Sequence, residues 1–430
     1  IAGPVKRTEK IERAFAWGAS AVRAVLEPYE TLFDAEIHEK TGPEAMLCLH
    51  GNALEIKRRL CFLEDGCALG RLLDIDVIAP DGRKLSRTEI GLSPRKCLLC
   101  ENDAPVCGRS RAHSADELFA RAGEIIDAHF EEAFIRRTAE NAQRALLCEV
   151  AVTPKPGLVD RHNSGAHDDM DVFTFIHSAC SLCGYFEACT RIGLAHRGGD
   201  AQACFDALRV PGLLAEADMR RATAGVNTHK GAIFSLGIAC ASLGMSWGEP
   251  FSAEHILLRC GEMTRLRMQD ELKNARQGQA RTFGEQVYQK KGVGGVRAEA
   301  AGGFAGVRET ALPRLNAALD AGLSLNDAAL CALTALMART EDTNAVRRGG
   351  EAGAKAMREK AQMLDSRMTA AIAAGKAQEV LDDFRHELTL WDQELTRQRI
   401  SPGGCADLLA LALLMRFCRE DADSSARAAK

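Results

Sequence analysis

The strongest constraint on the fold is a pattern that recurs from about residue 131 to the end of the chain. Apolar runs with helical spacing follow one another, and a polar, glycine-bearing loop precedes each run. No run in this part alternates convincingly in the way of a strand. The pattern predicts an all-α domain over residues 131–430, a helical bundle whose loops converge at one end and form a site.

The first 130 residues are predicted to form a separate, smaller α/β domain. Residues 8–26 have the spacing of an amphipathic helix, and residues 45–50 and 53–63 have the patterns of a strand and a helix. Residues 70–78, GRLLDIDVI, are rich in strand formers and end at a Pro-Asp-Gly turn signal. We therefore expect a multi-domain chain, with a small α/β domain over residues 1–130 and a larger helical-bundle domain after it.

Composition excludes several classes of partner. The net charge of −4 over 430 residues gives no general attraction to nucleic acid or acidic lipid. No apolar run is long and uncharged enough to span a membrane, and no signal peptide is recognisable. The sixteen cysteines are scattered through apolar helical runs, where a reduced thiol acts as a small hydrophobic side chain. We expect a reduced, cytoplasmic compartment and no nucleic-acid or membrane partner.

Residues 153–178, TPKPGLVDRHNSGAHDDMDVFTFIHS, form the densest of the polar loops. The stretch combines prolines and glycines with cations, histidines and clustered aspartates. Its backbone polar groups need local partners or water, which excludes a core element. Cations beside clustered carboxylates indicate a site for metal and phosphate, and the alternative is a solvated connector.

Residues 225–237, GVNTHKGAIFSLG, are predicted to open another helix. Asn227 or Thr228 is expected to cap it, which places His229 and Lys230 in the first helical turn. The helix dipole disfavours cations there unless an anion binds at the same place, held also by backbone N–H groups. We therefore predict phosphate binding; a simple cap with a tolerated lysine is the alternative.

Two further loops carry charged candidates. Residues 292–306 are glycine-rich, contain Arg297 and Glu299, and lack the G-K-[ST] of a Walker-type site. Such glycines let a backbone approach a ligand closely, although a flexible linker is the alternative. Residues 339–350, RTEDTNAVRRGG, again mix acid, amide and paired cations on a predicted loop: Asp342, Asn344, Arg347 and Arg348.

Asp74 and Asp76 lie on one face of the strand predicted over residues 70–78. Two carboxylates on one face repel each other unless a cation lies between them. One interpretation is a divalent-metal pair for phosphoryl or nucleotidyl transfer. The alternative is a solvated edge face that carries two aspartates.

A cysteine-rich stretch follows in residues 95–113, RKCLLCENDAPVCGRSRAH. Cys97, Cys100, Cys107 and His113 offer four ligands with the short spacing of structural zinc sites. The alternative is a set of free thiols beside a basic patch, because accidental C-x-x-C pairs are expected in a cysteine-rich chain. The arginines around them, including Arg95, are suited to an anionic ligand.

These motifs resemble two known families. GPVK near the start, TGPEA, GRLLDIDV and PRKCLLC…CGRSRAH together resemble the apo-citrate lyase phosphoribosyl-dephospho-CoA transferases, the CitX family. The family's usual opening segment is absent, and the chain begins with Ile1, so we expect this domain to be truncated at its start. TPKPGLVDRHNSGAHDDMD, GVNTHKGAIFSLG, GVRAEAAGGF, DTNAVRRGG and SPGGCADLLA resemble the triphosphoribosyl-dephospho-CoA synthases, the CitG family. Ala298 stands where that family usually has glycine, which is expected to tighten the loop.

The resemblance implies two consecutive transfers. ATP gives its triphosphoribosyl group to the ribose 2′-hydroxyl of dephospho-CoA, and adenine leaves. The phosphoribosyl-dephospho-CoA group then passes to a serine of the citrate lyase acyl carrier protein, and diphosphate leaves. Two alternatives for these reactions are a malonate decarboxylase carrier and, in the second half, a magnesium-dependent nucleoside or ADP-ribosyl hydrolase. A third is that the first segment only binds the carrier.

The resemblance also implies roles for residues, with ATP, dephospho-CoA and Mg²⁺ as ligands. Mg²⁺ is assigned to Asp74 and Asp76 in the first domain and to Asp168, Asp169 and Asp171 in the second. Candidate catalytic carboxylates, besides the first pair, are Asp160, Glu299 and Asp342. The candidates for binding phosphate or substrate are Arg71, Arg95, Lys155, Arg161, His167, Asn227, His229, Lys230, Arg297, Asn344, Arg347 and Arg348.

Overall fold

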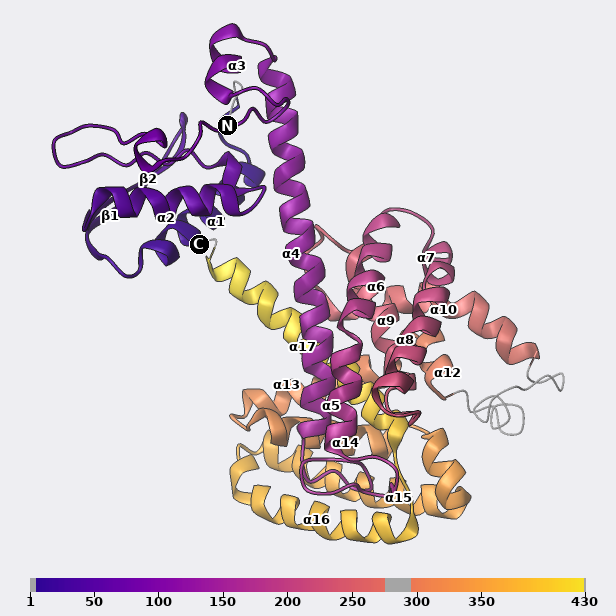
Figure 1. Ribbon diagram of the computed structural model, residues 1–430. Helices are drawn as coiled ribbons and strands as arrows, with labels where there is room; N and C mark the ends of the chain where they lie inside the picture. The colour runs from indigo at the N-terminus through magenta and orange to yellow at the C-terminus, as the bar shows by residue number, and fades with distance from the viewer. Residues whose placement is uncertain (1–4, 275–294, 429–430) are drawn as a thin grey trace. The chain divides into compact units, whose positions relative to one another are not determined.

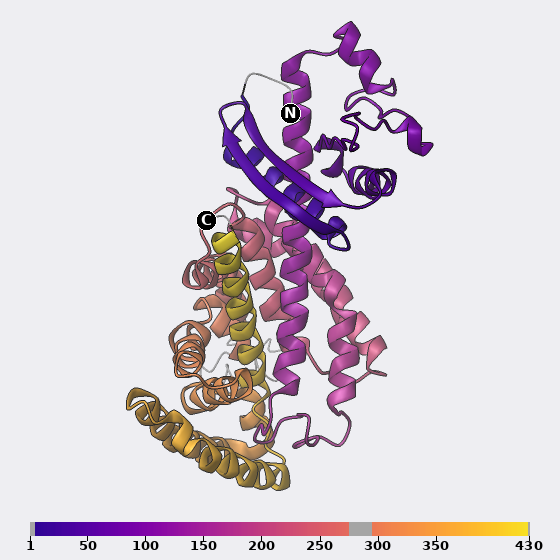
Figure 2. The same ribbon diagram turned by 90° about the vertical axis from the view of Figure 1, so that its left-hand side faces the viewer.

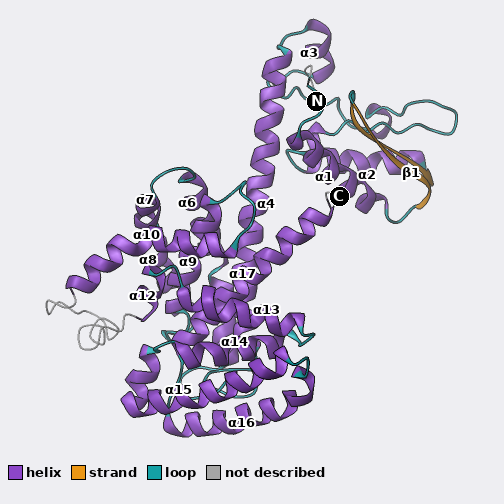
Figure 3. Ribbon diagram, turned by 180° about the vertical axis from the view of Figure 1, so that it is seen from behind, coloured by secondary structure: helices purple, strands orange, loops and turns teal. Residues whose placement is uncertain are grey.

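The computed structural model describes residues 5–274 and 295–428 and divides into two compact units, one up to Phe134 and one from Ile135 to Ala428 (Figure 1). The expectation of a mostly helical chain is confirmed. Within the described residues, the only sheet has two strands, coloured orange in Figure 3. The division between the units falls inside one continuous helix, α4 (Ala115–Ala151).

The first unit combines short helices with a β-hairpin. Before α4, its elements are α1 (Glu9–Leu26), β1 (Glu30–Glu39), β2 (Gly42–His50), α2 (Ala53–Gly66), η1 (Gly70–Leu72), η2 (Thr88–Ile90) and α3 (Ala104–Ser110). Side-chain oxygens of Thr8 and Asn52 cap α1 and α2, where helices were predicted. The sequence patterns did not predict β1, which pairs with β2 in an antiparallel hairpin (Figure 2).

The strand predicted over residues 70–78 is wrong. The segment starts as the 3₁₀ turn η1 and continues extended, with one isolated bridge between Ile78 and Lys84. Ile75 packs on a core of α1 and α2 residues, as an inward strand residue would. Side chains take the place of a neighbouring strand: Lys57 Nζ donates to Ile75 O at 3.0 Å, and Ile75 N donates to Glu64 Oε1 at 3.3 Å. The apolar alternation was therefore real, but the backbone found other partners.

The second unit is a bundle of helices over the described residues. They are α5 (Val172–Ser181), α6 (Cys183–Ala195), α7 (Ala201–Ala207), α8 (Arg209–Ala222), α9 (Lys230–Met245), α10 (Ala253–Asn274), α12 (Gly295–Ala301), η4 (Gly306–Ala311), α13 (Leu312–Asp320), α14 (Leu325–Arg339), α15 (Thr343–Ala373), η5 (Ala377–Val380), α16 (Leu381–Gln398) and α17 (Gly403–Ala428). Helices α9 and α14 are buried on nearly all sides, which marks them as the interior of the bundle. Helices α6 and α17 pack on α9, and α15 and α17 pack on α14.

Two of the predicted loops are partly helical. Within the described part of residues 292–306, Gly295–Ala301 forms α12; residues 292–294 lie outside the described residues. Ala298 is thus a helix residue, and its alanine favours the helix instead of tightening a loop. Residues 343–349 open α15, so Asn344, Arg347 and Arg348 project from a helix, which kinks at Gly350 (φ 67°).

The cap predicted for α9 is also wrong. His229 occupies the N-cap position without a capping hydrogen bond, and the Thr228 hydroxyl instead donates to Ser178 Oγ at 2.7 Å. Lys230 is in the first turn, as expected. The polar side chains before α9 therefore point to the neighbouring helix α5 and to the cavity described next.

Candidate active sites

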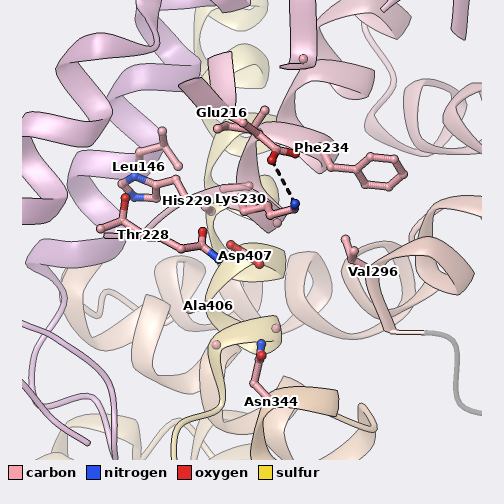
Figure 4. Close-up of a pocket in the computed structure, with 18 of the residues that line it drawn as sticks. Leu146, Glu216, Thr228, His229, Lys230, Phe234, Val296, Asn344, Ala406 and Asp407 are labelled. Carbon is pink, nitrogen blue, oxygen red and sulfur yellow. Dashed lines mark ion pairs between the residues drawn. The ribbon is translucent and has the colours of Figure 1, made fainter. Parts of the chain in front are cut away.

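Helix ends and loops of the second unit enclose a cavity of about 930 Å³ (Figure 4). Its walls come from the end of α4, the loop before α5, α8, the start of α9, α12, and the starts of α15 and α17. It is lined by these residues from the predicted set: Lys155, His167, Asp169, Asn227, His229, Lys230, Arg297, Asn344, Arg347 and Arg348. The structure therefore brings four loops that were predicted separately to one place.

Asp160 organises the loop between α4 and α5. Its carboxylate is 2% exposed and accepts four hydrogen bonds, from Thr153 Oγ1 and from backbone N–H groups of Lys155, His162 and Asn163, at 2.6–3.0 Å. It lies outside the set of cavity-lining residues. These contacts assign Asp160 to loop structure and do not support the catalytic role predicted for it.

The loop is also hydrogen-bonded to Asp392 of α16. Gly157 has φ 73°, and a Cβ there would come within 2.2 Å of Ile400 O. Its N–H donates to Asp392 Oδ1 at 2.9 Å, and Asn163 Nδ2 donates to Asp392 Oδ2 at 2.7 Å. Glycine is required at this position because both the φ angle and the close approach exclude a side chain.

Lys155 is buried in the cavity wall. It is 1% exposed, and its Nζ donates to Glu149 Oε1 at 2.5 Å and to Glu149 O at 2.7 Å. Burial raises the pKa of Glu149, and Lys155 opposes that shift. Because a buried lysine needs a counter-charge, this pair fixes the end of α4 to the loop. The charge of Lys155 is therefore already paired.

His229 presents a buried imidazole to the cavity. It is 3% exposed, and burial and Lys155 lower its pKa to about 3. The Ser178 hydroxyl accepts from Thr228 and lies 2.6 Å from His229 Nδ1; we assign the neutral tautomer in which this hydroxyl donates to Nδ1 and Nε2 carries the proton. Among the described residues, Nε2 has no hydrogen-bond partner. A buried N–H in a cavity wall without a partner is suited to a ligand acceptor.

His167 and Arg348 form the cationic edge. Arg348 Nη1 donates to Ala166 O at 2.9 Å, and Nη2 lies 3.2 Å from His167 Nδ1. An arginine only donates, so Nδ1 accepts and Nε2–H donates to Ser401 Oγ at 3.0 Å. Burial, then Arg348, lowers the pKa of His167, which is consistent with a neutral ring. Arg347 and Arg297 line the same cavity.

Lys230, on α9, and Asp407, on α17, both line the cavity (Figure 4). Lys230 Nζ forms an ion pair with Glu216 at 2.9 Å and stays half exposed. Asp407 lies against the start of α9, where a Cβ at Gly231 would come within 1.9 Å of its Oδ2. Burial, reinforced by Glu149 and Asp342, raises the pKa of Asp407 well above its usual range.

The sequence patterns missed Asp407. It follows SPGGCA at the start of an apolar helical run, and it was taken as part of the helix opening. A charged residue inside such a run is the signal that could have identified it, because an unpaired carboxylate is costly there. Glu149, the partner of Lys155, was missed in the same way near the end of α4.

The other predicted carboxylates support the helix ends. Asp342 caps α15 by accepting from Asn344 N and Ala345 N, and its Oδ2 accepts from Cys405 N at 2.9 Å. Glu299 Oε2 accepts from Gly306 N at 3.0 Å. Both lie outside the set of cavity-lining residues. Asp342 thus connects the start of α15 to the start of α17 rather than facing the cavity.

The predicted magnesium ligands of the second unit are dispersed. Asp168 pairs with Arg399 at 2.8 Å, and Asp171 caps α5 in a capping box with Thr174. Only Asp169, of these three, lines the cavity. Arg161 likewise lies outside the lining and reaches Asn326 Oδ1 at 3.4 Å. A single carboxylate suffices for a magnesium ion that phosphate oxygens also coordinate.

In the first unit, Asp74 and Asp76 are both exposed, and Asp76 pairs with Lys84 at 2.6 Å. Arg71 Nη2 donates to Lys96 O and Cys97 O at 3.1 Å.

Arg95 Nη1 donates to Leu73 O at 2.7 Å and forms an ion pair with the buried Glu64. Both predicted phosphate ligands, Arg71 and Arg95, therefore hold backbone segments together.

The cysteine-rich stretch is compact: the ligand atoms of Cys97, Cys100, Cys107 and His113 lie within 4.8 Å of one another.

Comparisons with known proteins agree with this two-part organisation. Residues 1–129 match the family model for apo-citrate lyase phosphoribosyl-dephospho-CoA transferase, CitX, and residues 135–425 match that for ATP:dephospho-CoA triphosphoribosyl transferase, CitG. The chain is a fused CitX and CitG family member. As members of these two families, its halves are transferases of citrate lyase prosthetic-group synthesis.

Similar proteins show the same fusion order. Protein CitXG of Haemophilus influenzae is 34% identical over 92% of this chain and 81% of its own length. Protein CitXG of Leuconostoc mesenteroides subsp. cremoris is 33% identical over 96% of this chain and 89% of its own length.

A third relative, from Vibrio cholerae serotype O1, is named probable 2-(5''-triphosphoribosyl)-3'-dephosphocoenzyme-A synthase. It is 40% identical over 64% of this chain and 85% of its own length. No described helix of the CitX–CitG chain is both long and apolar enough to cross a membrane.

Proposed function

We propose that this chain makes and installs the prosthetic group of citrate lyase. Residues 131–430 would form the synthase domain, which joins ATP and dephospho-CoA with release of adenine. Residues 1–130 would form a small α/β transferase domain, which moves the phosphoribosyl-dephospho-CoA group to a serine of the acyl carrier protein with release of diphosphate. We also propose a cytoplasmic location, because the cysteines of the described residues are free, as is usual in a reducing compartment.

The observation that carries the synthase assignment is the composition of the cavity. Its lining includes the cationic residues Lys230, Arg297, Arg347 and Arg348, which suit a triphosphate. Apolar and aromatic residues on other walls, such as Phe234 and Val296, suit a nucleobase and the rest of dephospho-CoA (Figure 4). A bound Mg²⁺ would neutralise phosphate charge, and Asp169 is the cavity carboxylate that would hold it.

The chemistry requires a bond from the dephospho-CoA 2′-oxygen to C1′ of the ATP ribose, while the bond from C1′ to adenine breaks. The 2′-hydroxyl loses a proton, and adenine gains one. Asp407 would exchange the proton, because its raised pKa suits a general acid–base and its side chain lines the cavity. The Nε2–H of His229 would bind a substrate oxygen or ring nitrogen.

In the first unit, Asp74 and Asp76 would support the attack of the carrier serine hydroxyl on phosphorus. They are exposed, so a carrier protein and a divalent ion can both reach them. The ion would stabilise charge on the attacking and leaving oxygens. The ion pair between Asp76 and Lys84 would open when the metal binds.

Adenine release tests the synthase half. We expect adenine to form only when ATP and dephospho-CoA are both present, because the ribose C1′ needs the 2′-hydroxyl as acceptor. Adenine released at full rate from ATP alone would instead establish a hydrolase.

Labelling tests the carrier. Incubation with labelled ATP, dephospho-CoA and each purified carrier protein is expected to label the citrate lyase carrier. Preferential label on a malonate decarboxylase carrier would overturn that part of the proposal.

A further inference from the structure

We infer that Cys97, Cys100, Cys107 and His113 bind a structural Zn²⁺ ion. Their ligand atoms all lie within 4.8 Å of one another, and this is the only group of three or more metal-type ligands that close in the described part of the chain. Cys97 and Cys107 are buried. Three sulfurs and one imidazole nitrogen are the ligand set of a structural Cys₃His zinc site.

The distances fit a tetrahedron. Zinc bonds of about 2.3 Å to sulfur and about 2.0 Å to nitrogen place neighbouring ligand atoms roughly 3.5–3.8 Å apart. Here Cys100 Sγ lies 3.4 Å from Cys107 Sγ and 3.3 Å from His113 Nε2. The ligands are thus already gathered, and small shifts would complete the coordination shell.

The backbone is folded to present the four ligands. Cys97 N donates to Asn102 O at 2.8 Å, and Ala104 N donates to Arg95 O at 2.7 Å, which closes a turn that carries the first two cysteines. Helix α3 carries Cys107 and ends at Arg111 with φ 49°, so the chain reverses before His113.

The local structure needs such support. Between η1 and α4, the described chain has one 3₁₀ turn and the seven-residue α3, and a helix this short is unstable alone. The other C-x-x-C of the chain, Cys180 and Cys183, lies in α5 and α6 and has no third ligand in the described residues. That pair is a natural control.

The loop of residues 95–113, which carries the four ligands, also positions the segment of Asp74 and Asp76. The effect on carrier labelling that follows from this rests on the proposed function. Arg71 connects the end of η1 to the carbonyls of Lys96 and Cys97, and Arg95 connects back to Leu73 O, next to Asp74. Loss of the metal would loosen these connections. Transfer to the carrier would fall, while adenine release by the second unit would continue.

Metal analysis of the full chain tests the inference directly. We expect one zinc per chain in the wild type, none in C97S/C107S, and one in the control C180S/C183S. Replacement of zinc by Co²⁺ is expected to give the visible absorption of tetrahedral cobalt with thiolate ligands, and the double variant should lack it. A metal-free wild type, or one in which Cys100 and Cys107 form a disulfide under reducing purification, overturns the inference.

A second measurement covers the case in which C97S/C107S does not fold. Zinc is removed from the wild type with a chelator and then restored, while circular dichroism and thiol reactivity are followed. We expect the thiols of the cluster to become reactive and to be protected again on zinc addition. Thiol reactivity that does not respond to zinc contradicts the site. Neither readout uses enzyme activity, so this failure is distinct from a failure of the proposed function.

Discussion

At the scale of single residues, the half-buried Asp407 and the buried Asp160 exemplify two roles of a carboxylate. Asp407 lines the cavity, whereas Asp160 lies outside the lining and accepts four hydrogen bonds inside its loop. We expect Asp407→Asn to lower kcat for adenine release by about 10²–10⁴-fold, the usual effect of losing a general acid–base. Its melting temperature should change little. Asp160→Asn should instead lower the melting temperature. If Asp160→Asn lowered kcat without a loss of stability, and Asp407→Asn lowered only stability, the catalytic role would belong to Asp160.

His229 predicts a pH dependence of stability. Its pKa falls from 6.5 to about 3 on folding because the charged ring is buried near Lys155. The unfolded chain therefore binds the proton more readily, so this stabilisation is complete above about pH 6.5 and is lost as the pH falls towards 3. Urea unfolding at several pH values should show this loss in the wild type. His229→Gln should show a shallower slope; an identical slope would contradict the neutral, buried ring.

At the scale of elements, the stability of α12 is expected to affect the cavity, because this helix carries the lining residue Arg297. Ala298 lies inside α12, next to Arg297, and a glycine there should cost about 0.5–1 kcal/mol of helix stability. We expect Ala298→Gly to loosen α12 and raise the KM for ATP severalfold. Ala370→Gly, at an exposed position of α15, is the matched control, with a similar stability loss and an unchanged KM. An unchanged KM in Ala298→Gly would show that the stability of α12 does not affect ATP binding.

At the scale of the whole molecule, each half should work without the other. Asp74→Asn/Asp76→Asn is expected to abolish labelling of the carrier but leave adenine release unchanged. Asp407→Asn should lower adenine release and, because the intermediate is then not made, carrier labelling from ATP and dephospho-CoA as well. Because the intermediate is a free small molecule, a mixture of the two variants should restore carrier labelling. Labelling that returns only when both active halves share one chain would show direct transfer between them.

Most of the helices, and the residue types that line the cavity, could be predicted from the sequence alone. These follow from spacing and local chemistry, which a short window contains. The sequence could not predict that Ile75 bonds to side chains instead of a strand, that Asp160 and Asp342 hold loops and helix ends, or that Asp407 lines the cavity. Those outcomes depend on which distant groups meet, and periodicity carries no information about the partner of a buried polar group.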